Sequence, residues 1–259
     1  MNYTYSHAQT SRYLGDYYTA DSALVNFVTL RNPNLSRGPS PYDQRHTFRT
    51  FLTYDLPFGT GKVWKTGHGA IDHVIGGWTV GTIVTLQSGR NFKLQSGYNT
   101  FNYSNAYWPN SCDSGVVLNG MTASQLQSKV GLYPGPTPAE PKVFLPPSLL
   151  TSNGSANPAV IAPPSTPGQL GQLVYLVGLK FVNTDISLVK SIPIKEQVRF
   201  NIYAEFLNAF NHTNWNVLDG FAGGTNNPAE YANISSSTFP ALSAPYSPRN
   251  IQFRLQLTF

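Results

Sequence analysis

Three residues capable of acid–base chemistry lie close together: Asp43, Arg45 and His46. A histidine near a carboxylate can exchange a proton near neutral pH, as a general base does. The same residues stand where a polar loop enters a strand-like stretch. An ion pair at this junction, with the histidine at the start of the strand, is the simpler interpretation. We therefore expect a structural role for this group, no catalytic residues and no enzyme activity.

A second charged group comprises Asp185, Arg199 and Glu205, which fall on the polar faces of two neighbouring predicted strands. Paired carboxylates can hydrolyse glycosidic bonds, but no glycosidase motif surrounds these two. Opposite charges on adjacent strands commonly stabilise a sheet. We expect these side chains to form ion pairs across the strands.

Two short motifs suggest cofactor chemistry that the surrounding residues do not support. The stretch Gly59–Lys62 looks like a phosphate-binding loop, but Leu56 stands where that loop needs its first glycine. His68 and His73 are close in sequence, but only Asp72 is near enough to act as a further metal ligand. We expect neither a cofactor nor a metal site.

Aromatic residues gather in one polar segment and are the best candidates for ligand contact. Rings with polar groups, interleaved with asparagines, suit stacking on sugars or peptides. The alternative is that these rings pack the segment onto its neighbours. The candidate residues are Tyr98, Phe101, Tyr103, Tyr107 and Trp108.

Composition limits the class of protein that must position these residues. Of the 259 residues, 11% are charged, whereas a soluble domain has roughly 25%. No apolar run approaches the ~18 residues of a membrane-spanning helix, so any insertion into a membrane must use strands. The net charge of +5 is spread along the chain without a basic cluster, so nucleic acid is not an expected partner. Cys112 is the single cysteine, which excludes an internal disulfide.

The last eleven residues, Arg249–Phe259, have the alternation of a strand with one apolar and one polar face. The apolar face continues to the terminal residue. This ending resembles the C-terminal signal of bacterial outer-membrane β-barrels, which their assembly machinery reads, although Arg254 stands where that signal has a glycine. The residues that match the signal are Gln252, Phe253, Leu255, Leu257 and Phe259.

Five further stretches show strand alternation, which gives six strands in all: 2–7, 46–56, 78–88, 182–192, 198–211 and 249–259. The connections alternate between long and short, as in transmembrane barrels with long external loops and short periplasmic turns. The longest connection, Asn91–Gly178, has a helical pattern only at Thr122–Val130, where Thr122 is a suitable N-cap. Lys190 interrupts an apolar face near a strand end, where we expect it to reach toward water.

Several motifs occur in the same order as in a known family. Together they resemble the C-terminal barrel of TonB-dependent outer-membrane transporters of the Oar-like type. The matching stretches are YDQRH at Tyr42–His46, YDLPFG at Tyr54–Gly59, GGW at Gly76–Trp78, SG at Ser88–Gly89, DISLVK at Asp185–Lys190 and AEFLNAFNH at Ala204–His212.

This resemblance implies an all-β fold, in which residues 1–259 supply the last six strands of an antiparallel transmembrane barrel of about 22 strands. It places the protein in the cell outer membrane, in contact with lipid and the barrel assembly machinery, and implies uptake of an unidentified substrate. Phe259 would lie at the periplasmic end, which makes 91–178 an extracellular loop. The plug, the signal peptide and the segment that contacts the TonB complex would lie upstream of Met1 in a longer protein.

An alternative function also fits the composition. A soluble or surface-attached β-sandwich that binds carbohydrate, as an adhesin does, would share the low charge and the many aromatic residues. Lysis and fractionation would separate the two, since a membrane barrel requires detergent for extraction and a soluble sandwich does not.

Overall fold

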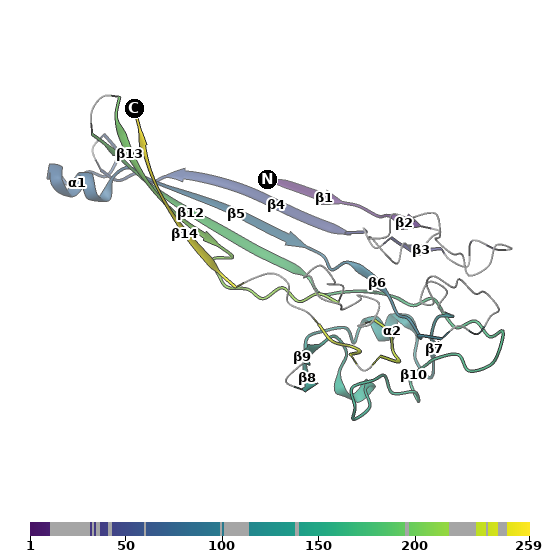
Figure 1. Ribbon diagram of the computed structural model, residues 1–259. Coiled ribbons are helices and arrows are strands. Elements are labelled where there is room, and N and C mark those ends of the chain that lie inside the picture. Colours follow the sequence, from purple (N-terminus) through teal and green to yellow (C-terminus); the bar gives the residue numbers. More distant parts are fainter. Residues whose placement is uncertain are drawn as a thin grey trace.

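Six long strands form one antiparallel sheet, here called the barrel sheet (Figure 1). The computed structural model describes residues 1–10, 32, 34, 37–40, 43–59, 61–98, 100, 114–137, 140–194, 197–217, 232–236, 238–242 and 248–259. The strand order is β1-β4-β5-β12-β13-β14. The strands are β1 (Asn2–Tyr5), β4 (His46–Asp55), β5 (Trp78–Gln87), β12 (Phe181–Pro193), β13 (Arg199–Leu207) and β14 (Asn250–Thr258). The predicted strands and their antiparallel arrangement are confirmed.

The register sorts the side chains of the barrel sheet onto two faces. On the apolar face, Ile202 lies opposite Leu255, and the neighbouring pairs Phe200↔Leu257 and Ala204↔Phe253 lie on either side. On the polar face, the pairs of the same two strands are Asn201↔Gln256, Tyr203↔Arg254 and Glu205↔Gln252. The apolar face continues across the sheet through the pairs Ile186↔Phe206, Leu188↔Val80, Val182↔Leu86, Phe48↔Leu86 and Tyr54↔Val80.

No other part of the described chain covers the apolar face of β14. Phe253 is 74% exposed and Leu255 is 65% exposed, and none of the buried hydrophobic side chains belongs to the barrel sheet. The other sheets among the described strands have two strands each, so none of them is the second large sheet that a β-sandwich would require. The outer edges of β1 and β14 have no partner strand in the described part of the chain, and the barrel sheet is therefore open.

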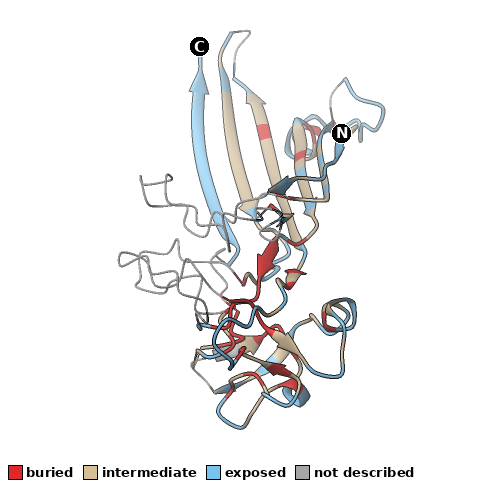
Figure 2. Ribbon diagram, turned by 90° about the vertical axis from the view of Figure 1, so that its right-hand side faces the viewer, coloured by how far each residue is buried: buried red, intermediate tan, exposed pale blue. Residues whose placement is uncertain are grey.

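All of the buried hydrophobic side chains of the described residues lie in a separate body, here called the loop domain. It comprises the described residues of 91–177 and 214–242 and lies at the end of the barrel sheet opposite the C-terminus (Figures 1 and 2). Phe144 occupies the centre of its core, with ring centroids 5.1 Å from Phe92 and 5.6 Å from Phe239. The described part of the segment that we predicted as a loop thus belongs to a folded unit with its own core.

Short elements surround this core. The strand pairs are β6 (Asn91–Lys93) with β11 (Tyr175–Val177), β7 (Val117–Leu118) with β10 (Ile161–Ala162), and β8 (Tyr133–Thr137) with β9 (Glu140–Val143); η4 (Pro147–Leu149) is a 3-10 helix. Another pair, β2 (Gln9–Thr10) with β3 (Gly38–Pro39), extends from the β1–β4 side of the barrel sheet.

The helix predicted at Thr122–Val130 is present as α2 (Ala123–Gln127). Thr122 caps it as expected: its hydroxyl accepts from the Gln125 backbone, and the Gln125 side chain accepts from the Thr122 backbone at 2.8 Å. This reciprocal capping box satisfies two backbone donors that the first turn of a helix leaves unpaired. Leu126 then carries the helix into the core of the loop domain.

The connection between β4 and β5 contains a helix that the sequence did not predict, α1 (Gly69–Ile75). It lies at the end of the barrel sheet that also holds the C-terminus (Figure 1). Lys190 is buried beside it and donates hydrogen bonds to the carbonyl oxygens of His73, Val74 and Gly76. The expectation that Lys190 reaches toward water is wrong, because the unpaired carbonyls at the helix end take up its charge.

Ionic contacts between the charged residues of the barrel sheet differ from the expectation. Arg199 lies opposite Thr258 and Pro193, while Glu205 lies opposite Gln252 and Ser187. The Asp185 carboxylate accepts from the Asn183 side chain at 3.0 Å and from the Asn208 backbone at 2.8 Å. The predicted cross-strand ion pairs are therefore wrong, since the register does not place these charged residues opposite one another.

The helices of the described residues are all too short or too polar to span a membrane.

The two faces of β14 give the first testable prediction. Substitution Leu255→Arg should destabilise the protein in lipid bilayers by roughly 2–4 kcal/mol, because it places a charge on the apolar face. The neighbouring Gln256→Arg, on the polar face, is the matched control and should cost little. Urea unfolding in lipid vesicles measures both, and equal losses from the two variants would contradict the assignment of the faces.

Candidate functional site

The barrel sheet and the loop domain are joined by a continuous two-stranded ribbon. The β5–β12 pair leads into the β6–β11 pair, with Gly178 donating to the Arg90 carbonyl at 2.9 Å between them. The chains approach closely here: a Cβ on Gly89 would lie 1.9 Å from the Gly178 carbonyl oxygen. Only glycine fits at position 89. The two paired strands therefore run directly from the barrel sheet into the loop domain.

A hollow of about 440 Å³, here called the mouth pocket, lies at this junction. The sheet contributes residues of its polar face, and the segment after β13 closes one side. A ligand in the mouth pocket would therefore lie on the polar face, away from lipid. The lining residues are Gln44, Arg49, Thr85, Gln87, Ser88, Arg90, Leu179, Lys180, Phe181, Asn183, Asn214, Trp215 and Asn216.

Asn214 holds the segment after β13 against the sheet. Its side chain accepts from the Val182 backbone at 2.8 Å and donates to the Val182 carbonyl at 2.9 Å. Beyond the end of β13, this buried amide takes the place of a neighbouring strand at the edge of β12. The clamp fixes Trp215, which packs against the core of the loop domain and lines the mouth pocket.

Trp215 also lines a second, more apolar hollow. That hollow has a volume of about 530 Å³ and is bordered by Val130, Leu132 and Val177 of the loop domain. The two hollows share the lining residues Ser88, Leu179, Lys180 and Trp215. Trp215 therefore borders both a polar and an apolar space.

A buried carboxylate fixes the rim of the barrel sheet close to the mouth pocket. Asp43 is 1% exposed and accepts from the Ala8 backbone at 2.7 Å and from the Asn91 side chain at 3.0 Å. Arg45 lies 3.4 Å and His7 3.6 Å from Oδ2, the oxygen that also accepts from Asn91, whereas Ala8 donates to Oδ1. Burial by itself raises the pKa of Asp43, but the hydrogen bonds and the Arg45 charge together lower it below the usual value.

The expected ion pair at this junction is thus present, with a different histidine. The exposed His46 instead forms a hydrogen bond between its Nδ1 and the Tyr3 hydroxyl, at 2.8 Å. Asp43 lies in the loop before β4 and contacts Ala8, after β1, and Asn91, at the start of β6. It therefore connects three segments that are distant in the sequence. This arrangement is that of a structural clamp.

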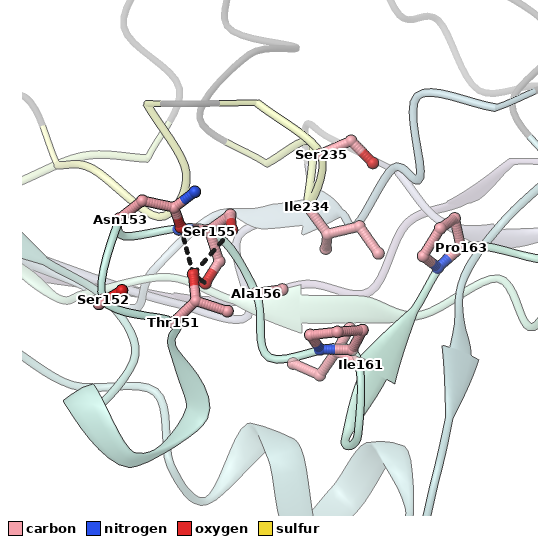
Figure 3. A pocket seen from close by; sticks show the side chains of 10 residues that line it. Thr151, Ser152, Asn153, Ser155, Ala156, Ile161, Pro163, Ile234 and Ser235 are labelled. Carbon is pink, nitrogen blue, oxygen red and sulfur yellow. Dashed lines mark hydrogen bonds between the residues drawn. The ribbon is translucent and has the colours of Figure 1, made fainter.

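A third hollow, of about 370 Å³, lies within the loop domain (Figure 3). Thr151, Asn153 and Ser155 point toward one another there, and the Thr151 and Ser155 hydroxyls are 2.8 Å apart. Ser155 also donates to the Asn153 side chain at 2.8 Å. These hydroxyl groups satisfy one another, and the described lining contains no charged residue, so the mouth pocket is the better candidate site.

The aromatic residues predicted to contact a ligand lie largely outside the described residues: Phe101, Tyr103, Tyr107 and Trp108 are not described. Tyr98 is 52% exposed and does not line any of the three hollows. Ligand contact by this group stays a prediction. The aromatic residue that does line the mouth pocket, Trp215, was missed, although its flanking asparagines Asn214 and Asn216 give it the same composition.

The residues matched to the assembly signal occupy β14 and the position after it. Phe253, Leu255 and Leu257 lie on the apolar face, and Gln252 lies on the polar face opposite Glu205. Phe259 follows the strand and is 92% exposed. Recognition of these residues by the assembly machinery stays a prediction.

A comparison with protein families decides the class of sheet. The family model described as "Outer membrane beta barrel domain" matches residues 1–252. The chain belongs to this family. The barrel sheet is accordingly the wall of an outer-membrane β-barrel, and the protein is located in the outer membrane. Searches of the curated proteins and of the solved structures found no match.

Membership of the outer-membrane barrel family explains the exposed apolar face. In transmembrane β-barrels the polar face lines the lumen and the apolar face contacts lipid. The mouth pocket opens on the polar face, beside the loop domain, which lies at one end of the barrel sheet.

Removal of the Asp43 charge gives the second prediction. The folded pKa lies below the unfolded value of about 3.9, so the carboxylate stabilises the protein at neutral pH, and this contribution is lost as the pH falls from about 4 through the folded pKa. Asp43→Asn should therefore cost about 1–3 kcal/mol at pH 7 and reduce the loss of stability below about pH 4. Urea unfolding in vesicles at a series of pH values measures both effects.

Asp55→Asn is the matched control, because Asp55 is an exposed carboxylate of the same β4 region that accepts from the Thr79 hydroxyl. It should change stability much less than Asp43→Asn. An Asp43→Asn variant that unfolds like the wild type at neutral pH would show that the clamp does not hold the rim.

Proposed function

We propose that this chain forms the C-terminal part of the barrel of a TonB-dependent transporter of the Oar-like type, which takes up a polar solute. The observation that carries the proposal is the folded loop domain at one end of the barrel sheet, with a polar hollow where the two meet. A barrel that only anchors a protein has no need of a pocket there. An importer needs a place where the solute is held before it passes through.

The motifs that carry the resemblance support the proposal, because they stand at turns on which the barrel sheet depends. Gly77 has a φ of 68°, and a Cβ there would lie 2.4 Å from the Ser191 carbonyl oxygen. Asn208 and Asn211, of the AEFLNAFNH stretch, have φ values of 50° and 52° and form the turn that leads to the Asn214 clamp. These stretches therefore determine the backbone conformation of turns in addition to the apolar–polar alternation of strands.

The open edges of the barrel sheet support a larger barrel. Unpaired backbone groups in lipid cost several kcal/mol each, so β1 and β14 each need a partner strand in the membrane. The resemblance supplies such strands, a plug and a TonB-contacting segment from upstream parts of a longer protein. The barrel of about 22 strands is part of this proposal.

The orientation of the barrel follows from the connections. The three longest connections leave the barrel sheet at the loop-domain end, whereas the β4–β5 connection with α1, the short β12–β13 turn and the C-terminus lie at the α1 end. Long loops face outside and short turns face the periplasm in such barrels. We therefore place the loop domain, with residues 91–178, outside the cell.

Cysteine labelling tests this orientation. In a Cys112→Ser background, Ser165→Cys in the loop domain should react with a membrane-impermeant maleimide on intact cells, because Ser165 is exposed. Lys65→Cys, exposed beside α1, is the matched control and should react only after the outer membrane is permeabilised. The reverse pattern would contradict the proposed topology.

Uptake tests the proposed energy coupling. Wild-type cells, cells without this protein and cells without TonB would be offered the same panel of solutes, and accumulation would be measured by mass spectrometry. Solutes that are lost without this protein should also be lost without TonB. A solute whose uptake needs this protein but continues at the wild-type rate without TonB would show that the barrel is a passive channel.

A further inference from the structure

Three cationic side chains of the mouth pocket have no partner in the described part of the chain. Arg49, Arg90 and Lys180 are exposed and line the pocket, and none of them makes a hydrogen bond or ion pair through its side chain with another described residue. Arg49 lies on β4, Arg90 lies between β5 and β6, and Lys180 directly precedes β12. The fold therefore gathers three positive charges from three segments into one hollow.

Two carboxylates at this end of the barrel sheet are already engaged. Asp185 accepts from Asn183 and from the Asn208 backbone, and Asp43 is buried in its clamp with Arg45. Within the described lining, the pocket contains no aspartate or glutamate. A positive potential in a hollow that is partly shielded from water concentrates anions from solution.

The rest of the lining suits a ligand that carries hydroxyl groups. Trp215 offers one aromatic wall, on which a sugar ring could stack. Gln44, Gln87 and Asn183 bring amide groups, which both donate and accept hydrogen bonds. The combination of an aromatic wall, amides and free cations differs from an apolar solute site, which would be lined mainly by hydrophobic side chains.

We propose that the mouth pocket binds an anionic carbohydrate, with its acidic groups on Arg49, Arg90 and Lys180 and a sugar ring against Trp215. This inference rests on the proposed function, whose solute class it names. Lipid headgroups are not the source of the anion, because the pocket opens on the polar face and lipid contacts the apolar face. Guanidinium groups can pair with carboxylate or sulfate through two hydrogen bonds, which favours acidic sugars over neutral ones.

Binding to the purified full-length protein in detergent tests the proposal. The probes are trigalacturonate, which carries carboxylates, a sulfated oligosaccharide of similar length, and neutral maltotriose, each titrated by calorimetry. At least one charged probe should bind roughly tenfold more tightly than maltotriose, and its affinity should fall in about 1 M salt, where charges are screened beyond about 3 Å. The two charged probes distinguish carboxylate from sulfate as the anion.

The double variant Arg90→Gln/Lys180→Gln should weaken binding of the charged probe by about tenfold or more and leave maltotriose unaffected. Arg199→Gln/Arg254→Gln is the matched control, because it removes two cations from the polar face outside the pocket. Both double variants should reach the outer membrane and resist urea like the wild type.

Three results would overturn the proposal: no binding of either charged probe, equal affinity for maltotriose, or equal weakening by the control variant. The uptake experiment separates this inference from the proposed function. TonB-dependent uptake of only neutral solutes would refute the anionic pocket and leave the transporter intact. If the charged probe binds through the pocket residues but uptake continues without TonB, the anionic pocket is supported and the proposed energy coupling is refuted.

Discussion

The structure depends on one constraint, the environment of a strand in lipid. Such a strand must, first, satisfy its backbone hydrogen bonds within the sheet and, second, direct apolar side chains to lipid and polar side chains to the lumen. The register of the barrel sheet meets the second condition, since Ile202 faces Leu255 on one side and Asn201 faces Gln256 on the other. None of the buried hydrophobic side chains belongs to this sheet, because its apolar side chains face lipid instead of a protein core. The hydrophobic core belongs instead to the loop domain.

Polar clamps join these two differently stabilised bodies. Asn214 supplies the edge of β12 with both of its missing hydrogen bonds, and Asp43 connects β6 to the rim beside β1. Hydrogen bonds to such buried groups are costly to break one at a time. The loop domain is therefore held in a defined position over the lumen, and the mouth pocket is formed at the seam.

Strand periodicity made the barrel sheet predictable, because alternation is local and each face has a single environment. The α2 start was predictable for the same reason: Thr122 and Gln125 form the cap within four residues. The seven-residue helix α1 was missed because contacts distant in sequence, such as Lys190 with its carbonyls, stabilise it. The mouth pocket was missed because its residues meet only in the folded chain: Arg49, Arg90, Lys180 and Trp215. The ion pairs expected for Arg199 and Glu205 were wrong because strand register cannot be predicted from residue spacing alone.

The central claim is that the apolar face contacts lipid while the polar face lines an aqueous lumen. Spin labels placed singly along β13 and β14 of the protein in lipid bilayers test it most directly. Labels at Ile202 and Phe253 should collide with oxygen dissolved in lipid, and labels at Asn201 and Arg254 should collide with a water-soluble nickel reagent. Collision rates that fail to alternate between neighbouring positions, or that alternate in the opposite sense, would contradict the account.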